Sequence, residues 1–580
     1  MHTLVIRNGT VVDGMNAAPR MADVAVDNGV ITGIGNNLGP GHRVIDAAGR
    51  LVTPGWVDIH THYDGQATWD PAMTPSSWHG VTTTVFGNCG VGFAPVRRGS
   101  ERYLINLMEG VEDIPESVLS EGLSFDWESF GDYLDVLDST PRIMDVGAQV
   151  PHSALRFYVM GERGADHAQV PDESQIDQMA RLLEQALHQG ALGFSTSRTT
   201  KHRAADGRFA PSLSAAEPEL SGIAMAMRRA RKGVFQVNSD FGPGEFERLR
   251  AAATTAQRPL SLLLLQVDNA PERWRQTLAG VEQACASGLP VSAQVGSRAI
   301  GVLMSLRGTV HPFVTHPLWQ ALAAMDDDAR IAAVVADAGL RTRLVRERPA
   351  DRHGDWMDRV IERTFTLDDP IDYEPDPAQS IAQRARALGR DPFDLALELL
   401  LANKGRDLLM HPFENYTDGS LDVVHEMLRH PHTVSGLADG GAYVGLICDA
   451  SSPTTLLSFW ARDRRRGPHL PIEWLVHKQT AATANTYGLH DRGRIAIGLR
   501  ADLNIIDFDR LSVGKPWVAR DLPAGGRRIL QAASGYAHTF VAGIEVSCDG
   551  QATGARPGRL VRGARSASTP TICNEQVPNR

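Results

Sequence analysis

Two histidines one residue apart, His60 and His62, follow a short apolar run in the stretch VDIHTHYDG (57–65). Successive side chains of a strand point to opposite faces, so the two imidazoles share one face and Thr61 points the other way. Two neutral imidazoles that converge from one strand end suit a divalent metal such as zinc. A pair of ordinary surface histidines is the alternative that this spacing leaves open.

Two more side chains at the ends of apolar runs could join the same metal. Cys89 ends the run VTTTVFGNCG, where it could be a thiolate ligand or a small buried hydrophobe. Asp439, in SGLADGGAY, would add a carboxylate, although an aspartate before Gly-Gly is also typical of a turn. These residues therefore predict a metal site. A buried hydrophobic role for Cys89 and a turn role for Asp439 stay open as alternatives.

Other polar side chains near strand ends suggest roles in binding. His152, in VPHSALR, could polarise a carbonyl or be a hydrogen-bonded structural residue. Arg198 and Lys201, in STSRTTKHR, could hold a substrate carboxylate or form an exposed cationic loop. We assign substrate binding to Arg198, Asn238, Gln266 and Arg298, and keep Asp64, Asn88, Asp240 and His316 in reserve.

The composition is that of a globular protein with a small-molecule ligand. The 580 residues are 42% hydrophobic and 22% charged, with a formal net charge of −10. Such a charge gives no electrostatic reason to expect nucleic acid or an anionic membrane as partner. Five cysteines without paired spacing, an N-terminus without an apolar signal region and no run of about 18 apolar residues indicate a cytoplasmic protein.

Amphipathic helices alternate with apolar strands from about residue 54 onward. In PDESQIDQMARLLEQALHQG, Asp172 and Gln175 form a capping-box pattern and Gly190 ends the helix, after which the strand ALGFSTSR follows. The same order recurs before VFQVNSD, VSAQV and TVSGLAD. Such βα units predict an α/β fold with a parallel sheet.

The ends of these strands favour a barrel. The runs that end near Ser195, Asn238, Gln294 and Asp439 would deliver polar groups to one mouth of a (β/α)8 TIM-like barrel. An open doubly wound sheet is the structural alternative, but no G-x-G-x-x-G follows an early strand.

Both ends of the chain contain short β-branched runs separated by glycines, a pattern typical of antiparallel hairpins. We expect a small β-sandwich built from residues 1–53 and 491–562. The barrel would span residues 54–490, with an insertion around 300–410 that could cover its mouth. Residues 563–580 read as a flexible tail.

Several motifs give this sequence a specific resemblance over nearly its whole length. They are TPGWVDIHTHYD, HGVTTTVFGNCG, VPHSALR, GALGFSTS, LADGGAY, TAATANTYGLHDRGRIAIGLRADLNIID and TGARPGRL. Together they resemble the amidohydrolase superfamily, specifically its D-aminoacylase (N-acyl-D-amino-acid deacylase) branch. The resemblance implies a metal-bearing (β/α)8 barrel with a β-sandwich made from the two termini. It also implies that His60, His62 and Cys89 are zinc ligands, and that Asp439 is the general base on a metal-bound water.

One part of the family pattern is missing. The family places further histidine ligands at the ends of two middle strands, which here read VFQVNSD and LLLLQVDN, with Asn238 and Gln266 or Asp268 near those places. An amide oxygen is a poor zinc ligand beside imidazole. We therefore expect one divalent ion, zinc being favoured over other metals, held by His60, His62, Cys89 and Asp439.

The sequence thus predicts a metal-dependent amidohydrolase of a non-peptide C–N bond. We favour an N-acyl-D-amino acid or a related N-acyl or cyclic amide as substrate, cleaved by metal-activated water with Asp439 as base and His152 as a second catalytic residue. Two alternatives stay open: the same barrel could cyclise, decarboxylate or eliminate, or it could be a catalytically silent binding barrel. The sequence also leaves a homo-oligomer open.

Overall fold

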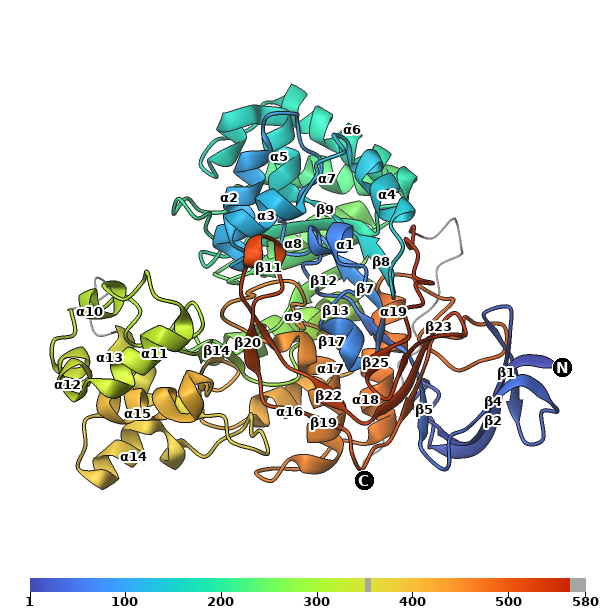
Figure 1. The fold of residues 1–580 in the computed structure, drawn as a ribbon. Helices are drawn as coiled ribbons and strands as arrows, with labels where there is room; N and C mark the ends of the chain where they lie inside the picture. The colour runs from blue at the N-terminus through green and yellow to red at the C-terminus, as the bar shows by residue number, and fades with distance from the viewer. Residues whose placement is uncertain (350–355, 564–580) are drawn as a thin grey trace.

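Helices and strands alternate along most of the chain in the computed structural model, which describes residues 1–349 and 356–563 (Figure 1). The predicted mixed α/β class is confirmed. Within these ranges, no helix is both long enough and apolar enough to cross a membrane. The tail predicted for residues 563–580 lies outside the described residues, apart from Gly563.

Parallel strands form two sheets that follow each other along the chain. The first contains β6 (Trp56–Asp58), β7 (Val81–Phe86) and β8 (Asp145–Ala148). The second runs through β9 (Val150–Pro151), β10 (Gly193–Arg198), β11 (Val234–Ser239), β12 (Leu260–Leu263), β13 (Val291–Val295) and β17 (Thr433–Ser435). Only Gln149 separates β8 from β9, and a parallel bridge pairs Thr61, after β6, with Gly440, after β17. The pairings therefore lead from β6 to β17 and back to β6.

The helices predicted before these strands are confirmed. Asp172 accepts a hydrogen bond from the Gln175 amide at 2.9 Å, and the Gln175 side chain accepts one from the Asp172 amide at 3.0 Å. Gly190, with φ +124°, ends this helix. The helices are α6 (Glu173–Gln189), α7 (Glu217–Ala230), α9 (Arg273–Ala286) and α16 (Asp422–Arg429), which precede β10, β11, β13 and β17.

Both chain ends contribute to one nine-stranded sheet, in which β5 pairs antiparallel with β18. Its strands are β1 (His2–Val11), β2 (Arg20–Asp27), β3 (Val30–Gly35), β4 (Gly41–Asp46), β5 (Leu51–Pro54), β18 (Leu503–Ile506), β23 (Tyr536–Val541), β24 (Ile544–Cys548) and β25 (Gln551–Ala552). The N-terminal strands lie at the right of Figure 1, and β18 joins β5 to β23 in the order of this sheet.

The expectation that all N-terminal strands form antiparallel hairpins is wrong. The β2–β3 hairpin forms around Asn28 and Gly29, but β4 and β5 pair parallel to β1. Residues 36–40 return the chain to the start of β1, where the His2 amide donates to the Pro40 carbonyl at 3.0 Å. Because β4 begins beside the first residues of β1, it runs in the same direction.

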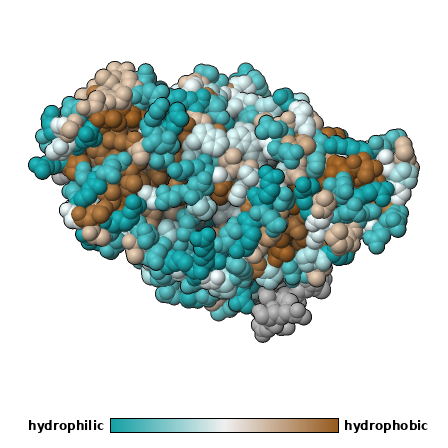
Figure 2. Space-filling model, turned by 60° about the horizontal axis from the view of Figure 1, so that its bottom comes forward, coloured by the Kyte–Doolittle hydropathy of each residue, from teal (hydrophilic) through white to brown (hydrophobic). Residues whose placement is uncertain are grey.

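The segment from β14 (Ile300–Met304) to β16 (Leu409–Glu414) has its own hydrophobic cluster, which includes Phe313, Trp319 and Leu400. Its helices gather at the left of Figure 1. They are α10 (Pro317–Gln320), α11 (Asp327–Ala336), α12 (Ala338–Arg346), α13 (Trp356–Glu362), α14 (Ile381–Leu388) and α15 (Pro392–Gly405). Figure 2 shows hydrophobic side chains gathered on that side of the molecule. The segment therefore has both a core and exposed apolar surface.

His79 joins the loop before β7 to the C-terminal part of the chain. Its Nε2 lies 3.0 Å from the Gln531 carbonyl oxygen, and its Nδ1 lies 2.8 Å from Thr454 Oγ1. Because a carbonyl only accepts, Nε2 carries the proton and Nδ1 accepts from the threonine hydroxyl. Burial lowers the pKa of His79 to about 4, so the ring is neutral at neutral pH.

We expect His79 to make the protein sensitive to acid. The unfolded histidine has a pKa of about 6.5, so the unfolded chain binds more protons between about pH 6.5 and 4. The contribution of neutral His79 to the free energy of unfolding is fully present above about pH 6.5. It decreases by up to about 3 kcal/mol as the pH falls to about 4. Substituting His79→Gln keeps a donor for Gln531 and removes the titration. Thermal unfolding midpoints at pH 7.5 and 5 should therefore lie closer together for the variant than for the wild type. Two parallel pH profiles would contradict this role.

Candidate metal centre

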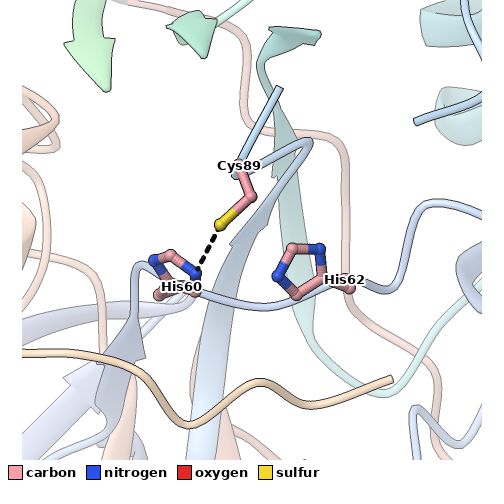
Figure 3. Close-up of side chains that lie close together, drawn as sticks. All are labelled: His60, His62 and Cys89. Carbon is pink, nitrogen blue, oxygen red and sulfur yellow. Dashed lines mark hydrogen bonds between the residues drawn. The ribbon is translucent and has the colours of Figure 1, made fainter. Parts of the chain in front are cut away.

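Three buried side chains and the largely buried Asp439 converge where the segments after β6, β7 and β17 meet. His60 Nε2 lies 3.4 Å from Cys89 Sγ and 3.4 Å from Asp439 Oδ1. His62 Nε2 lies 3.7 Å from the same carboxylate oxygen, and the two imidazole centroids are 5.4 Å apart. Figure 3 shows Cys89 pointing toward His60, with His62 on the same side. The donor atoms of the two histidines and the cysteine all lie within 4.8 Å of one another.

These separations fit a zinc ion. In a tetrahedral site with bonds of about 2.0–2.3 Å, neighbouring ligand atoms are about 3.3–3.8 Å apart. The distances that join His60 to Cys89 and to Asp439, and His62 to Asp439, fall in this range. Two imidazoles, a thiol and a carboxylate are also the donor types that zinc binds in proteins.

The backbone brings Asp439 to the histidines. The Asp439 amide donates to the His60 carbonyl at 3.0 Å, and the His62 amide donates to the Gly440 carbonyl at 2.8 Å. A Cβ atom at Gly440 would lie 2.7 Å from Tyr63 Oη, and one at Gly441 would lie 2.8 Å from the His62 carbonyl oxygen. The Gly-Gly pair is therefore required because this loop packs directly against residues 60–63.

Several residues of the site have left-handed backbone conformations. The φ angles are +55° at Cys89, +58° at Leu437, +47° at Asp439 and +47° at Tyr443. Such conformations cost non-glycine residues about 1–3 kcal/mol each and persist where the surrounding structure enforces them. Their concentration at this one place indicates a site that is held in position at the expense of local strain.

A glutamine orients the first histidine. Gln294, on β13, directs Oε1 to His60 Nδ1 at 2.8 Å and donates from Nε2 to Ser261 Oγ at 2.8 Å. The hydrogen bond places the His60 proton on Nδ1, which leaves the Nε2 lone pair facing Cys89 and Asp439. Burial lowers the pKa of His60 to about 4, so the ring is neutral, as a metal ligand must be.

The centre is rich in buried acidic groups. Burial raises the pKa of Asp58 and of Asp64 to about 7, and raises the pKa values of Glu112, Cys89 and Asp439 well above their ordinary values. Among the described residues, Asp58 Oδ2 and both Glu112 carboxylate oxygens have no hydrogen-bond partner. A divalent cation would stabilise the ionised forms of these groups and favour the Cys89 thiolate. The orphaned oxygens therefore support a metal at this place.

Asn238 lies at the edge of the four-residue centre and His152 does not join it. Asn238 Nδ2 lies 3.5 Å from Cys89 Sγ and 3.3 Å from His202 Nε2. His152 is fully buried, with its ring nitrogens 2.9 Å from Thr196 Oγ1 and 3.0 Å from Glu219 Oε1. Both nitrogens of His152 are thus engaged within the protein.

The other side chains assigned to substrate binding, and Lys201, contact acidic partners. Arg198 pairs with Glu245, Lys201 with Glu414, and Arg298 with Asp449 at 2.9 Å. Gln266 Nε2 donates to Asp418 at 2.8 Å. Of the reserve residues, Asp64 accepts from the Gly87 amide, Asn88 bonds to the Thr61 and Val85 carbonyls, Asp240 accepts from Thr199 and Thr200, and His316 caps α10 in the inserted segment.

The structure adds three side chains that the sequence interpretation did not assign to the site. They are Glu112 beside His62, Gln294 beside His60, and the buried His202 beside Asn238. Of these three residues, only Gln294 could have been found from the sequence, because it is a polar residue near the end of an apolar strand. His202 lies in the quoted stretch STSRTTKHR, but nothing in its spacing distinguishes it from the cationic residues around it.

A small cavity with a volume of about 20 Å3 lies beside Asp439. It is lined by Gln66, Pro75, Asp439, Gly441, Ala442, Val444, Ile447, Cys448, Asp449, Ala450, Arg528 and Ile529. The carboxylate therefore stands between the metal donors and a cavity with both polar and apolar walls that has room for about one water molecule.

Comparisons with known proteins agree with this arrangement. The pattern of the Amidohydrolase family matches residues 43–546. An N-acyl-D-glutamate deacylase of Alcaligenes xylosoxydans xylosoxydans is 26% identical over 583 residues, covering 96% of each chain.

Two solved structures share the fold over 97% of this chain and all of theirs. One is a D-aminoacylase described by its binuclear metal centre, at 24% identity and a TM-score of 0.64. The other is an N-acyl-D-glutamate deacylase of Bordetella bronchiseptica complexed with zinc and a phosphonate mimic of the tetrahedral intermediate, at 22% identity and a TM-score of 0.62.

Proposed function

This chain belongs to the amidohydrolase family, in its D-aminoacylase branch, and from that membership we propose that it hydrolyses an N-acyl-D-amino acid or a related N-acyl or cyclic amide. The proposal makes it a metal-dependent hydrolase of a carbon–nitrogen bond other than a peptide bond, acting on a small molecule. The names of relatives that deacylate N-acyl-D-glutamate and N-acyl-D-aspartate support this substrate class.

One observation carries the proposal: the donor atoms of His60, His62 and Cys89 lie within 4.8 Å of one another, and Asp439 Oδ1 lies 3.4 and 3.7 Å from the two imidazole nitrogens, distances that suit a single zinc ion. When bound, a divalent ion supplies Lewis acidity toward a carbonyl and lowers the pKa of a water molecule. Asp439 is the proposed general base, because its carboxylate faces both histidines and borders the cavity.

The protein residues carry out the proton transfers. Asp439 takes a proton from the attacking water and passes it to the leaving nitrogen, first as a base and then as an acid. Gln294 keeps His60 in the tautomer that offers Nε2 to the centre. We propose that Arg298, Arg198, Asn238 and Gln266 bind substrate and that His152 polarises or orients it. These roles require the pairs Arg198–Glu245 and Arg298–Asp449 to open, and they require Gln266 to leave Asp418 and the buried His152 to leave Thr196 or Glu219.

We propose one ion per chain. The two middle strands end near Asn238 and Gln266, which are amides, and Gln266 is bonded to Asp418. The buried His202 imidazole lies beside Asn238, with 3.3 Å between His202 Nε2 and Asn238 Nδ2, and it is not part of the group of His60, His62 and Cys89 whose donor atoms lie within 4.8 Å of one another. A D-aminoacylase whose description includes one-metal activation and second-metal attenuation supports a functional single ion.

We further propose that β6 to β13 and β17 form a (β/α)8 barrel and that the terminal strands form the small β domain. The ring of pairings from β6 back to β6, and the joining of β5 to β18, support this division. The proposed boundaries remain 1–53, 54–490 and 491–562, with the separate cluster of the inserted segment supporting an insertion around 300–410.

The first test is metal content together with turnover. Protein purified without added metal or chelator should contain about one zinc or similar ion per chain by elemental mass spectrometry. It should hydrolyse N-acetylated D-amino acids, lose that activity on chelation and regain it with zinc. Hydrolysis in 18O-labelled water should place one label in the released carboxylate.

Two results would overturn the proposal. A protein without metal after reconstitution would exclude the metal-dependent mechanism. A substrate converted without incorporation of solvent oxygen would instead favour cyclisation, decarboxylation or elimination on the same fold.

A further inference from the structure

We propose that Glu112 is a positioning residue that holds His62 as the Nδ1-protonated tautomer and so raises the metal affinity of the centre. The inference rests on the proposed function, because it requires a metal at His60 and His62. It assigns a role to a carboxylate that comes from α2 (Glu101–Glu112), a helix between β7 and β8 that carries none of the proposed ligands.

The geometry places the carboxylate behind the histidine. Glu112 Oε1 lies 3.2 Å from His62 Nδ1, while His62 Nε2 faces Asp439 on the other side of the ring. The two groups lie within hydrogen-bond distance but are not aligned as a hydrogen bond, and neither His62 Nδ1 nor the Glu112 oxygens have another hydrogen-bond partner among the described residues, so a small rotation of the carboxylate would pair them. The arrangement has the order carboxylate, imidazole, metal position, in which the carboxylate selects the tautomer and raises the basicity of the ligand nitrogen.

The main chain fixes Glu112 in this position. Its carbonyl accepts a hydrogen bond from the Tyr443 amide, which belongs to the loop that carries Asp439. The next residue, Asp113, ends α2 with φ +52°. The segment that supplies the carboxylate is therefore tied to the segment that supplies the general base.

Folding alone does not account for a glutamate at this position. The side chain of Glu112 is fully buried, and no described Lys or Arg pairs with it. It also lies at the carboxyl end of a helix, where the helix dipole disfavours negative charge. An unpaired buried carboxylate destabilises the folded state. A cation that withdraws electron density from His62 would offset this cost, because the Nδ1 proton would then bond more strongly to Glu112.

Zinc affinity of the metal-free full-length protein tests the role directly. Titration in competition with a chromogenic chelator should give a zinc Kd about 10- to 100-fold weaker for Glu112→Leu than for the wild type. Glu112→Gln keeps the shape and an acceptor oxygen, so its loss should be smaller. Glu109→Gln, one turn earlier on α2, is the matched control and should bind zinc as the wild type does.

A second measurement separates positioning from folding. The thermal unfolding midpoint of metal-free Glu112→Gln should be equal or close to that of the metal-free wild type, since the variant keeps the shape and replaces a buried carboxyl group that has no hydrogen-bond partner among the described residues. Cobalt-substituted wild type and Glu112→Leu should differ in their visible absorption, because the imidazole that ligates the ion has lost its partner.

The outcomes distinguish this inference from the proposed function. If the wild type binds no zinc at all, the proposed function fails and this inference with it. If the wild type binds zinc and Glu112→Leu binds it within about twofold, only the positioning role is overturned. A large drop in the metal-free unfolding midpoint of Glu112→Gln, with unchanged zinc Kd, would make Glu112 a structural residue.

Discussion

Asp439→Asn is expected to lower kcat/KM for amide hydrolysis by about 10²- to 10⁴-fold, because an amide cannot accept the proton from the attacking water. Burial, with the neighbouring Asp449 and Asp58 carboxylates, raises the pKa of Asp439. A cation at the four-residue centre lowers it again, which leaves an ionised base at neutral pH. The rate should be measured at saturating zinc, so that any weakening of metal binding does not enter the comparison.

Asp509→Asn is a suitable control for Asp439→Asn, because Asp509 is exposed and lies outside every site proposed above. The control should keep the wild-type rate. Full activity of zinc-saturated Asp439→Asn would show that another group accepts the proton, and the proposed mechanism would be wrong.

The second large effect is expected from the paired change His60→Ala, His62→Ala. Two of the proposed ligands disappear, so zinc should be lost from the purified protein and hydrolysis should fall by about 10³-fold or more. Elemental analysis and initial rates on the same samples measure both effects. Retention of stoichiometric zinc would place the ion elsewhere.

The chain contains a matched control for this pair. His430 and His432 have the same H-x-H spacing, with ring centroids 5.6 Å apart. They lie just before β17, at the opposite end of a parallel strand from Asp439, and His430 pairs with the exposed Glu282 at 2.8 Å. The change His430→Ala, His432→Ala should leave both zinc content and the rate near their wild-type values.

These two histidine pairs show the limit of what local spacing predicts. The spacing H-x-H occurs at both places, so spacing alone does not identify a ligand pair. What identified His60 and His62 was their place after an apolar run, together with Cys89 and Asp439 after two others. Parallel strands end at the same edge of a sheet, so such residues are expected to meet. The structure brings all four together.

Local sequence also determined three features of the fold. They are the alternation of helices and strands, the capping box at Asp172 and Gln175, and the β2–β3 turn at Asn28 and Gly29. Each depends on hydrogen bonds and side-chain periodicity within a few residues, which a single sequence displays directly. The parallel pairing of β4 and β5 with β1 did not follow in this way, since it depends on where a connecting segment crosses the sheet.

Only the tertiary structure determined the surroundings of the ligands. Glu112 ends an ordinary amphipathic helix, Gln294 lies in a strand more than two hundred residues after His60, and His202 lies in a polar loop. No spacing links them to the histidines, because contacts of buried polar groups are set by how distant elements pack. The sequence by itself therefore determined which residues offer metal-binding atoms. The packed fold decided which neighbours set the tautomers and charges of those residues, because burial and partner distance exist only once the chain is folded.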